Sequence, residues 1–102
     1  SLRASGKEPD VSTIKMERSH SLGVAKAKKA VDRVAQHIIE RFQVEAHWNK
    51  HTLEFSRTGV HGEIAVTADH VSVRAQISFL LLPIKGAIEQ EIRRYLDQEF
   101  GS

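Results

Sequence analysis

The stretch VEAHWNKHTLEFSRTGVHGEIAVTADHVSVRAQIS, residues 44–78, decides the fold of this chain. Apolar and polar residues alternate within it in four runs, which is the period of strands that bury one face. The runs cover residues 44–49, 52–57, 60–67 and 70–78. Turn-forming residues separate them: Asn49 with Lys50, Thr58 with Gly59, and Ala68 with Asp69. Strands at this short spacing predict an antiparallel meander.

The segments that flank the meander predict one further strand and two helices. Residues 12–18 alternate Ile14 and Met16 with polar residues, as a half-buried strand does. Apolar residues recur at steps of three and four over residues 24–42, and again from Pro83 onward, which predicts two amphipathic helices. The two apolar stripes are Ala27, Ala30, Val31, Val34, Ala35, Ile38 and Phe42, and Ile84, Ile88, Ile92, Tyr95 and Leu96.

The expected order is therefore strand, helix, four strands, helix. Two amphipathic helices and a half-polar sheet bury one another if both helices cover the same face. The sequence thus predicts an α+β two-layer sandwich, with an antiparallel sheet of about five strands and two helices on one face. At the start of the first helix we expect Gly23 or Ser21 as the N-cap, with Leu22 stapled against the first turns.

Length and composition narrow the class of protein. The 102 residues fit one α+β domain, assigned to residues 12–100, after a disordered leader or cloning remnant over residues 1–11. The absence of cysteine excludes disulfides, thiol catalysis and thiolate metal sites. The longest apolar run is far shorter than the roughly 20 residues that a membrane-spanning helix needs. The net charge of +2 is too small to indicate a phosphate-binding surface.

The alternation of the last strand fails at residues 79–83, FLLLP, where four large apolar residues run into a proline. If the strand continued, Phe79 and Leu81 would stay on its buried face, while Leu80 and Leu82 would point to the polar face. In one interpretation the chain turns a corner here and its own loop covers the leucines. In the other, an exposed patch meets a partner, and its candidate contact residues are Phe79, Leu80, Leu82 and Pro83.

Six histidines raise the question of a metal or acid/base site. His47 and His61 occupy outward positions on neighbouring predicted strands, near the outward glutamates Glu45, Glu54 and Glu63. No metal-ligand spacing occurs, so solvated sheet side chains explain this group better. The sequence predicts no catalytic, cofactor-binding or metal-binding residue.

His20 lies between two serines at the first strand-to-helix turn, which invites a comparison with nucleophilic catalysis. No nucleophile elbow and no orienting acid accompany it in this segment. We therefore expect His20 to bond backbone groups at the helix start.

A basic cluster lies in the first turns of the first predicted helix, where the helix dipole disfavours cations. Lys26, Lys29 and Arg33 are therefore candidate contacts for an anion. Solvation of an outer helix face produces the same pattern, and the lack of interleaved aromatic residues or a binding motif argues against nucleic acid.

Three stretches resemble, in their order and spacing, the small bacterial family described as "putative polyhydroxyalkanoic acid system proteins". They are ERSHSLG at residues 17–23, FSRTGVHGEIAV at residues 55–66 and FLLLPIKGAIEQEI at residues 79–92. The similarity runs from Ile14 to Phe100. The family takes its name from regions that encode storage-polyester synthesis and granule proteins, and it supplies no activity or catalytic residue to carry over.

The resemblance implies a non-enzymatic accessory protein of the polyhydroxyalkanoate system, cytoplasmic and granule-associated, that acts through contact with granule proteins or the polyester surface. Such a surface is apolar, which favours the exposed-patch interpretation. Because one or two leucines give only weak attachment, we also expect a homodimer, formed through the open sheet face or the patch. The alternative is a binding protein or enzyme for a small apolar ligand, such as a hydroxyacyl group, enclosed between Trp48, Phe55, Phe79 and Tyr95.

Overall fold

The computed structural model describes residues 11–101. Its elements follow the predicted order, with a 3-10 helix added before the last α-helix. They are β2 (Val11–Ser19), α1 (Gly23–Phe42), β3 (Glu45–Asn49), β4 (Thr52–Arg57), β5 (Val60–Val66), β6 (His70–Ser78), the 3-10 helix η1 (Phe79–Ile84) and α2 (Lys85–Phe100). Of the leader predicted over residues 1–11, all but Val11 lie outside the described residues, and Val11 begins β2.

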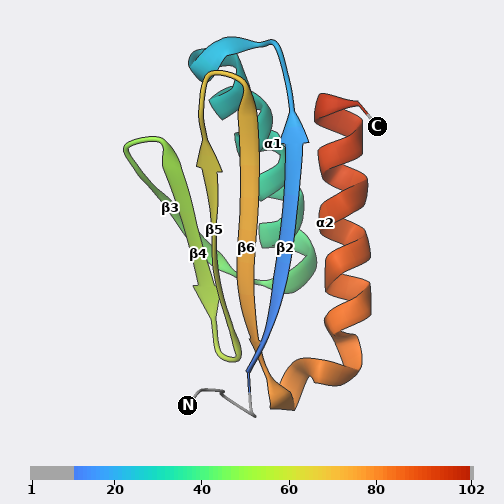
Figure 1. The fold of residues 1–102 in the computed structure, drawn as a ribbon. Helices are drawn as coiled ribbons and strands as arrows, with labels where there is room; N and C mark the ends of the chain where they lie inside the picture. The colour runs from blue at the N-terminus through green and yellow to red at the C-terminus, as the bar shows by residue number, and fades with distance from the viewer. Residues whose placement is uncertain (1–10, 102) are drawn as a thin grey trace, which may run out of the picture.

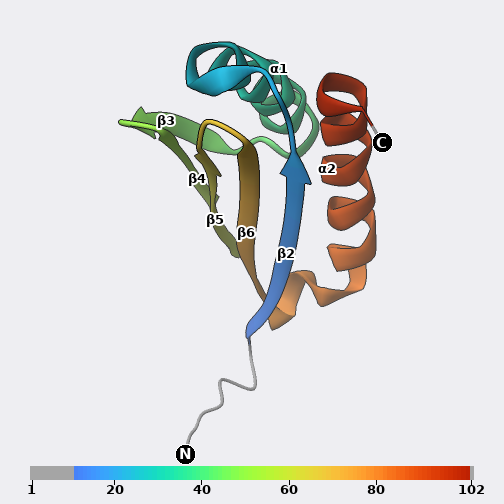
Figure 2. The same ribbon diagram turned by 45° about the horizontal axis from the view of Figure 1, so that its top comes forward.

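The strands form one antiparallel sheet in the order β2-β6-β5-β4-β3. β3 to β6 are the predicted meander, and β2, the first strand in the chain, joins it at the edge beside β6. Figures 1 and 2 show α1 and α2 on the same side of this sheet. The predicted two-layer α+β architecture, with both helices on one face, is therefore confirmed.

The core lies between the helices and the face of the sheet that they cover. Burial alternates along the strands as predicted: in β5, Val60, Ile64 and Val66 are buried, whereas His61 and Glu63 are exposed. From α1, the predicted stripe is buried from Ala27 to Ile38. From α2, the buried residues are Ile88, Ile92, Tyr95 and Leu96. The opposite face of the sheet carries mostly polar side chains and is covered by neither helix.

α2 is fastened to β2 at both of its ends. At its start, the Lys85 Nζ donates to the Ser12 Oγ at 2.6 Å, and near its end the Asp97 carboxylate pairs with the Arg18 guanidinium at 2.6 Å. Three further contacts join α2 to α1: the ion pairs Arg33–Glu99 and Arg41–Glu91 and the stacked rings of His37 and Tyr95. Early residues of α1 meet late residues of α2, so the helices run antiparallel.

The predicted start of α1 is wrong in detail. Leu22, rather than Gly23 or Ser21, occupies the N-cap, and it makes no side-chain capping bond. The reason is that the Nδ1 atom of His20 accepts the Leu22 backbone N–H at 3.1 Å, in place of a conventional cap. Gly23 follows with φ +79°, a conformation that glycine adopts without strain. The Leu22 side chain is 40% exposed and is not a staple.

Candidate apolar contact surface

The residues Phe79–Ile84, here called the apolar corner, form η1 at the end of β6. A 3-10 helix has about three residues per turn, so the two-face alternation stops where the strand ends, at Ser78. Within residues 11–101, four of the five exposed large apolar residues belong to this corner: Phe79 (55% exposed), Leu80 (71%), Leu82 (43%) and Ile84 (44%). Neither Leu80 nor Leu82 is covered by the described part of the chain.

Two predictions about this segment are wrong. Phe79 was expected on the buried face, but the strand ends before it and its side chain is exposed. The last α-helix was expected to open at Pro83 with Ile84 on its buried stripe. Pro83 lies instead inside η1, and Ile84 has φ −107° and ψ 8°, outside the helical region, so α2 begins at Lys85.

Leu81 anchors the corner to the rest of the fold. Its side chain is half-buried against the core and lies over Gly59, in the turn between β4 and β5. A Cβ atom at Gly59 would lie only 2.8 Å from the Leu81 Cδ1. The backbone N–H of Ser78 also donates to the Gly59 carbonyl at 2.9 Å. One inserted leucine and one backbone bond thus hold a segment whose other large side chains stay 43–71% exposed.

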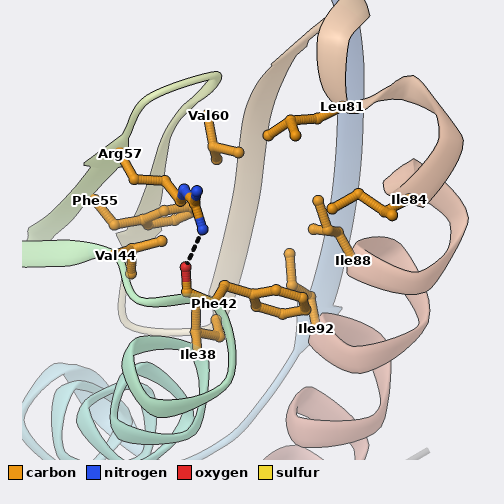
Figure 3. A pocket seen from close by; sticks show the side chains of 10 residues that line it. All are labelled: Ile38, Phe42, Val44, Phe55, Arg57, Val60, Leu81, Ile84, Ile88 and Ile92. Atoms are coloured by element: carbon orange, nitrogen blue, oxygen red, sulfur yellow. Dashed lines mark hydrogen bonds between the residues drawn. The ribbon is translucent and has the colours of Figure 1, made fainter.

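An apolar crevice adjoins the corner where the end of α1, the start of α2 and the sheet meet (Figure 3). Its walls are almost entirely apolar: Ile38, Phe42, Val44, Phe55, Val60, Leu81, Ile84, Ile88 and Ile92, with Arg57 as the one charged residue. The Nη1 of Arg57 donates to the Phe42 carbonyl at 2.7 Å, a bond between two residues of the lining (Figure 3). The cavity volume is about 20 Å³, which is room for about one water molecule.

The predicted ligand cavity between four aromatic residues is not formed. Only Phe55 lines the crevice, and Phe79 faces solvent. The Trp48 Nε1 donates to the Asp32 carboxylate at 2.8 Å, with the Lys28 ammonium 4.8 Å from the ring centroid. Tyr95 is buried, and its hydroxyl donates to the Glu91 carboxylate at 2.7 Å. Phe55 and Tyr95 lie in the hydrophobic core and Trp48 packs against it, whereas Phe79 is exposed, so the four do not enclose one ligand.

The candidate anion contacts on α1 are not equivalent. Lys26, Lys29 and Arg33 are all exposed, and no acidic residue lies in the first turn of α1. The Arg33 guanidinium is paired with the Glu99 carboxylate of α2 at 2.8 Å, so the carboxylate already partly neutralises the charge of Arg33. Lys26 and Lys29 make no ion pair with any residue between 11 and 101, and they remain the candidates for an anion.

The histidines of the open face do not assemble a metal site in the described part of the chain. His47 lies 3.1 Å from the Glu54 carboxylate, its cross-strand neighbour. His61 is opposite Ser56 on one side and Gln76 on the other. Among residues 11–101, no group of three or more His, Asp or Glu side chains could hold a metal ion.

His20 bonds the backbone at both ring nitrogens. Its Nδ1 accepts the Leu22 N–H, and its Nε2 lies 3.1 Å from the Thr67 carbonyl, which can only accept, so Nε2 must donate. The ring also lies against Phe100, with the centroids 5.6 Å apart. The expected backbone-bonding role is observed, and this use of both nitrogens leaves none to act as a base.

One titrating pair was not anticipated from the sequence. Where the turn after β5 leads into β6, the Nδ1 of His70, the first residue of β6, lies 3.0 Å from the Asp69 carboxylate. The bond to Asp69 raises the pKa of His70 above its ordinary 6.5, and the bond to His70 lowers the pKa of Asp69 below 3.8. The alternation pattern identifies Asp69 only as a turn residue. An Asp followed directly by a His in a tight turn is the feature of the sequence that could have indicated this pair.

The model of the family described as "Putative polyhydroxyalkanoic acid system protein" matches residues 14–100. This match covers nearly all of the described fold. The chain belongs to this family. No curated protein sequence matches it. The description of this family fits an association with the polyhydroxyalkanoate system. No helix described in residues 11–101 is both long enough and apolar enough to cross a membrane.

Proposed function

We propose that this protein is a non-enzymatic accessory of the polyhydroxyalkanoate system that attaches to the apolar surface of storage-polyester granules through the apolar corner. The observation that carries the proposal is the concentration of exposed Phe79, Leu80, Leu82 and Ile84 in one six-residue turn. Single exposed apolar residues are ordinary, but a contiguous group of this kind marks an interaction site. The protein would thus work in the cytoplasm, at granules, as a homodimer whose interface is inferred below.

The anchoring of the corner supports attachment over a purely structural role. Leu81 holds the segment against Gly59, so the outward side chains are presented on a fixed turn and little ordering is needed on contact. Full burial of one leucine contributes about 1.5–3 kcal/mol, so a few partly buried side chains give weak, reversible attachment. Such attachment suits a protein that exchanges between granule and cytoplasm.

The crevice offers less support for the alternative, a binding protein or enzyme for a hydroxyacyl group. Its volume of about 20 Å³ is far below the roughly 300 Å³ of an ordinary small-molecule site. His20, the nearest resemblance to a catalytic base, has both ring nitrogens engaged by backbone groups.

Co-sedimentation with particles of poly(3-hydroxybutyrate) tests the proposal. Leu80→Asp with Leu82→Asp should abolish sedimentation while leaving thermal unfolding unchanged, because both side chains are exposed. Leu22→Asp is the matched control, since Leu22 is the remaining exposed large apolar residue and lies on another part of the surface. Equal binding by the double variant and the wild type would refute the corner as the contact site. In polymer-accumulating cells, a fluorescent fusion should follow the same pattern at granules.

A further inference from the structure

Five ionisable side chains form one continuous row across the open face of the sheet. The strand register places His47 opposite Glu54, Glu54 opposite Glu63, Glu63 opposite Arg74, and Arg74 opposite Lys15. Each strand therefore contributes one member, in the sheet order from β3 to β2. All five lie on the face that neither helix covers.

The charges in this row are segregated by sign. The two glutamates are direct neighbours on β4 and β5, and the two cations are direct neighbours on β6 and β2. Like charges directly opposite one another destabilise a sheet, so the Glu54–Glu63 and Arg74–Lys15 neighbours are unfavourable within one subunit, while Glu63 opposite Arg74 is the one oppositely charged neighbour at the centre of the row. Glu54 has His47 at 3.1 Å, but Glu63, Arg74 and Lys15 form no ion pair or side-chain hydrogen bond with residues 11–101. An alternating order would have matched the charges internally.

We infer that the open face pairs with the open face of a second copy about a two-fold axis that runs along the strands, between β5 and β6. That rotation exchanges the two halves of the row. It places Glu63 of each subunit over Arg74 of the other, and Glu54 over Lys15. The segregated order that is unfavourable in the monomer becomes complementary in the dimer.

The rows on either side of the charged row allow the two faces to approach. The row toward the β5–β6 turn consists of Asn49, Thr52, Ala65, Ser72 and Glu17, and the row toward the corner consists of Glu45, Ser56, His61, Gln76 and Thr13. Small side chains lie at the centre, where Ala65 is opposite Ser72 and both are already half-buried. Sheets of this kind can pack face to face with their strands nearly aligned.

The direction of the axis decides where the two apolar corners lie. Rotation about an axis along the strands keeps both corners at the same end of the dimer. A two-fold axis across the strands would send the corners to opposite ends, and it would also place glutamates over glutamates. The order of the charges therefore favours the axis along the strands, which places both apolar corners at the same end of the dimer, where both can contact one surface. The dimer does not rest on the proposed granule attachment, although it would strengthen that attachment through two linked contacts.

A charge-swap experiment tests the interface by analytical ultracentrifugation. One variant carries Glu54→Lys and Glu63→Lys, and the other carries Lys15→Glu and Arg74→Glu. The wild type should dimerise at low salt and dissociate as salt is added, since exposed charges are screened. Each variant alone should self-associate at least about tenfold more weakly, and an equimolar mixture of the two should restore dimers.

Monomeric wild type at low salt, or variants that self-associate as well as the wild type, would overturn the interface. If a double variant fails to fold by circular dichroism, Glu63→Gln and Arg74→Gln serve instead, and each should weaken the dimer. Neither substitution touches the apolar corner, so loss of the dimer and loss of polyester binding by the isolated subunit are separate results.

Spin labels test the axis, because the chain has no cysteine of its own. Thr58→Cys labels the turn at the corner's end of the sheet, and Ala68→Cys labels the turn at the other end; both sites are exposed. In the inferred dimer, pulsed electron resonance should give short distances for each labelled homodimer and a long distance for the mixed pair. The reverse pattern would overturn the axis.

Discussion

Leu81 and Gly59 are in such close contact that no side chain fits between them. A Cβ built on Gly59 would lie 2.8 Å from the Leu81 Cδ1, closer than carbon atoms approach, and Gly59 has φ +88°, which other residues rarely adopt. The contact joins the β4–β5 turn to the apolar corner, across a long separation in sequence. The glycine of one turn thus sets the position of the surface that η1 presents.

Gly59→Ala should therefore destabilise the protein by about 1–3 kcal/mol, through both backbone strain and the displaced leucine. Urea denaturation measures the effect. Gly86→Ala is the matched control, because an added Cβ there meets nothing within 4 Å, and alanine favours a helix by about 0.5–1 kcal/mol. If Gly59→Ala unfolded at the wild-type urea midpoint, the anchoring of Leu81 would be wrong.

A charge on the covered part of the α2 stripe should be far more damaging than one at its start. Ile88→Asp places a carboxylate where the side chain is 5% exposed, and this should cost about 4 kcal/mol or more. Ile84→Asp, four residues earlier, should cost only about 1–2 kcal/mol, because that side chain is 44% exposed although it also lines the apolar crevice. Thermal unfolding of the two variants compares them directly. Equal losses would show that Ile84 is part of the core.

The Asp69–His70 pair should make a small, pH-dependent contribution. Because the pKa of His70 is raised in the folded state, the contribution of His70 to stability is complete below its ordinary pKa of 6.5. This contribution is lost as the pH rises through the pKa of the folded state. Because the folded pKa of Asp69 is lowered, its contribution is complete above the ordinary 3.8 and is lost in acid below it. The pair therefore stabilises the fold most between these two pH values. Nuclear magnetic resonance titration should show the pKa of His70 falling in Asp69→Asn, and an unchanged titration would contradict the pairing.

His20 should be present as the Nε2–H tautomer, since its Nδ1 accepts from Leu22 and its Nε2 donates to Thr67. The nitrogen chemical shifts of the imidazole report this tautomer directly. His20→Ala should cost about 1–3 kcal/mol, because the Leu22 N–H and the Thr67 carbonyl both lose a partner. His51→Ala, at an exposed turn, is the control and should leave stability nearly unchanged. The opposite tautomer would invalidate the assigned bonds.

The strands were predictable because alternation is a local property. Each run from 44–49 to 70–78 needs only its own residues to show which face is buried, and the observed β3 to β6 differ from the predicted runs by at most one residue at an end. The stripe of α1 was predictable for the same reason. The common face for both helices followed from the presence of only one apolar face on the sheet.

The corner could not be predicted in the same way. In the run from Phe79 to Leu82 every residue is large and apolar, so neither a period of two nor a period of three stands out. The exposure of Phe79 depends on where β6 ends, and the backbone N–H of Ser78 at that end bonds to Gly59, a residue distant in sequence. Trp48 and Tyr95 were placed in one cavity because both are aromatic, whereas partners distant in sequence, Asp32 for Trp48 and His37 for Tyr95, separate them.

The edge position of β2 has a consequence for how the chain is assembled during synthesis. β2 is synthesised before the other strands of the sheet, yet its whole length pairs with β6, from Val11 opposite Ser78 to Ser19 opposite His70. It must therefore wait, without a sheet partner, until the meander has been translated. α2 emerges later still and closes over β2 through Arg18 and Lys85. This fold is thus completed only after β6 and α2 have been synthesised, and chaperone protection would matter most for β2 while it has no sheet partner.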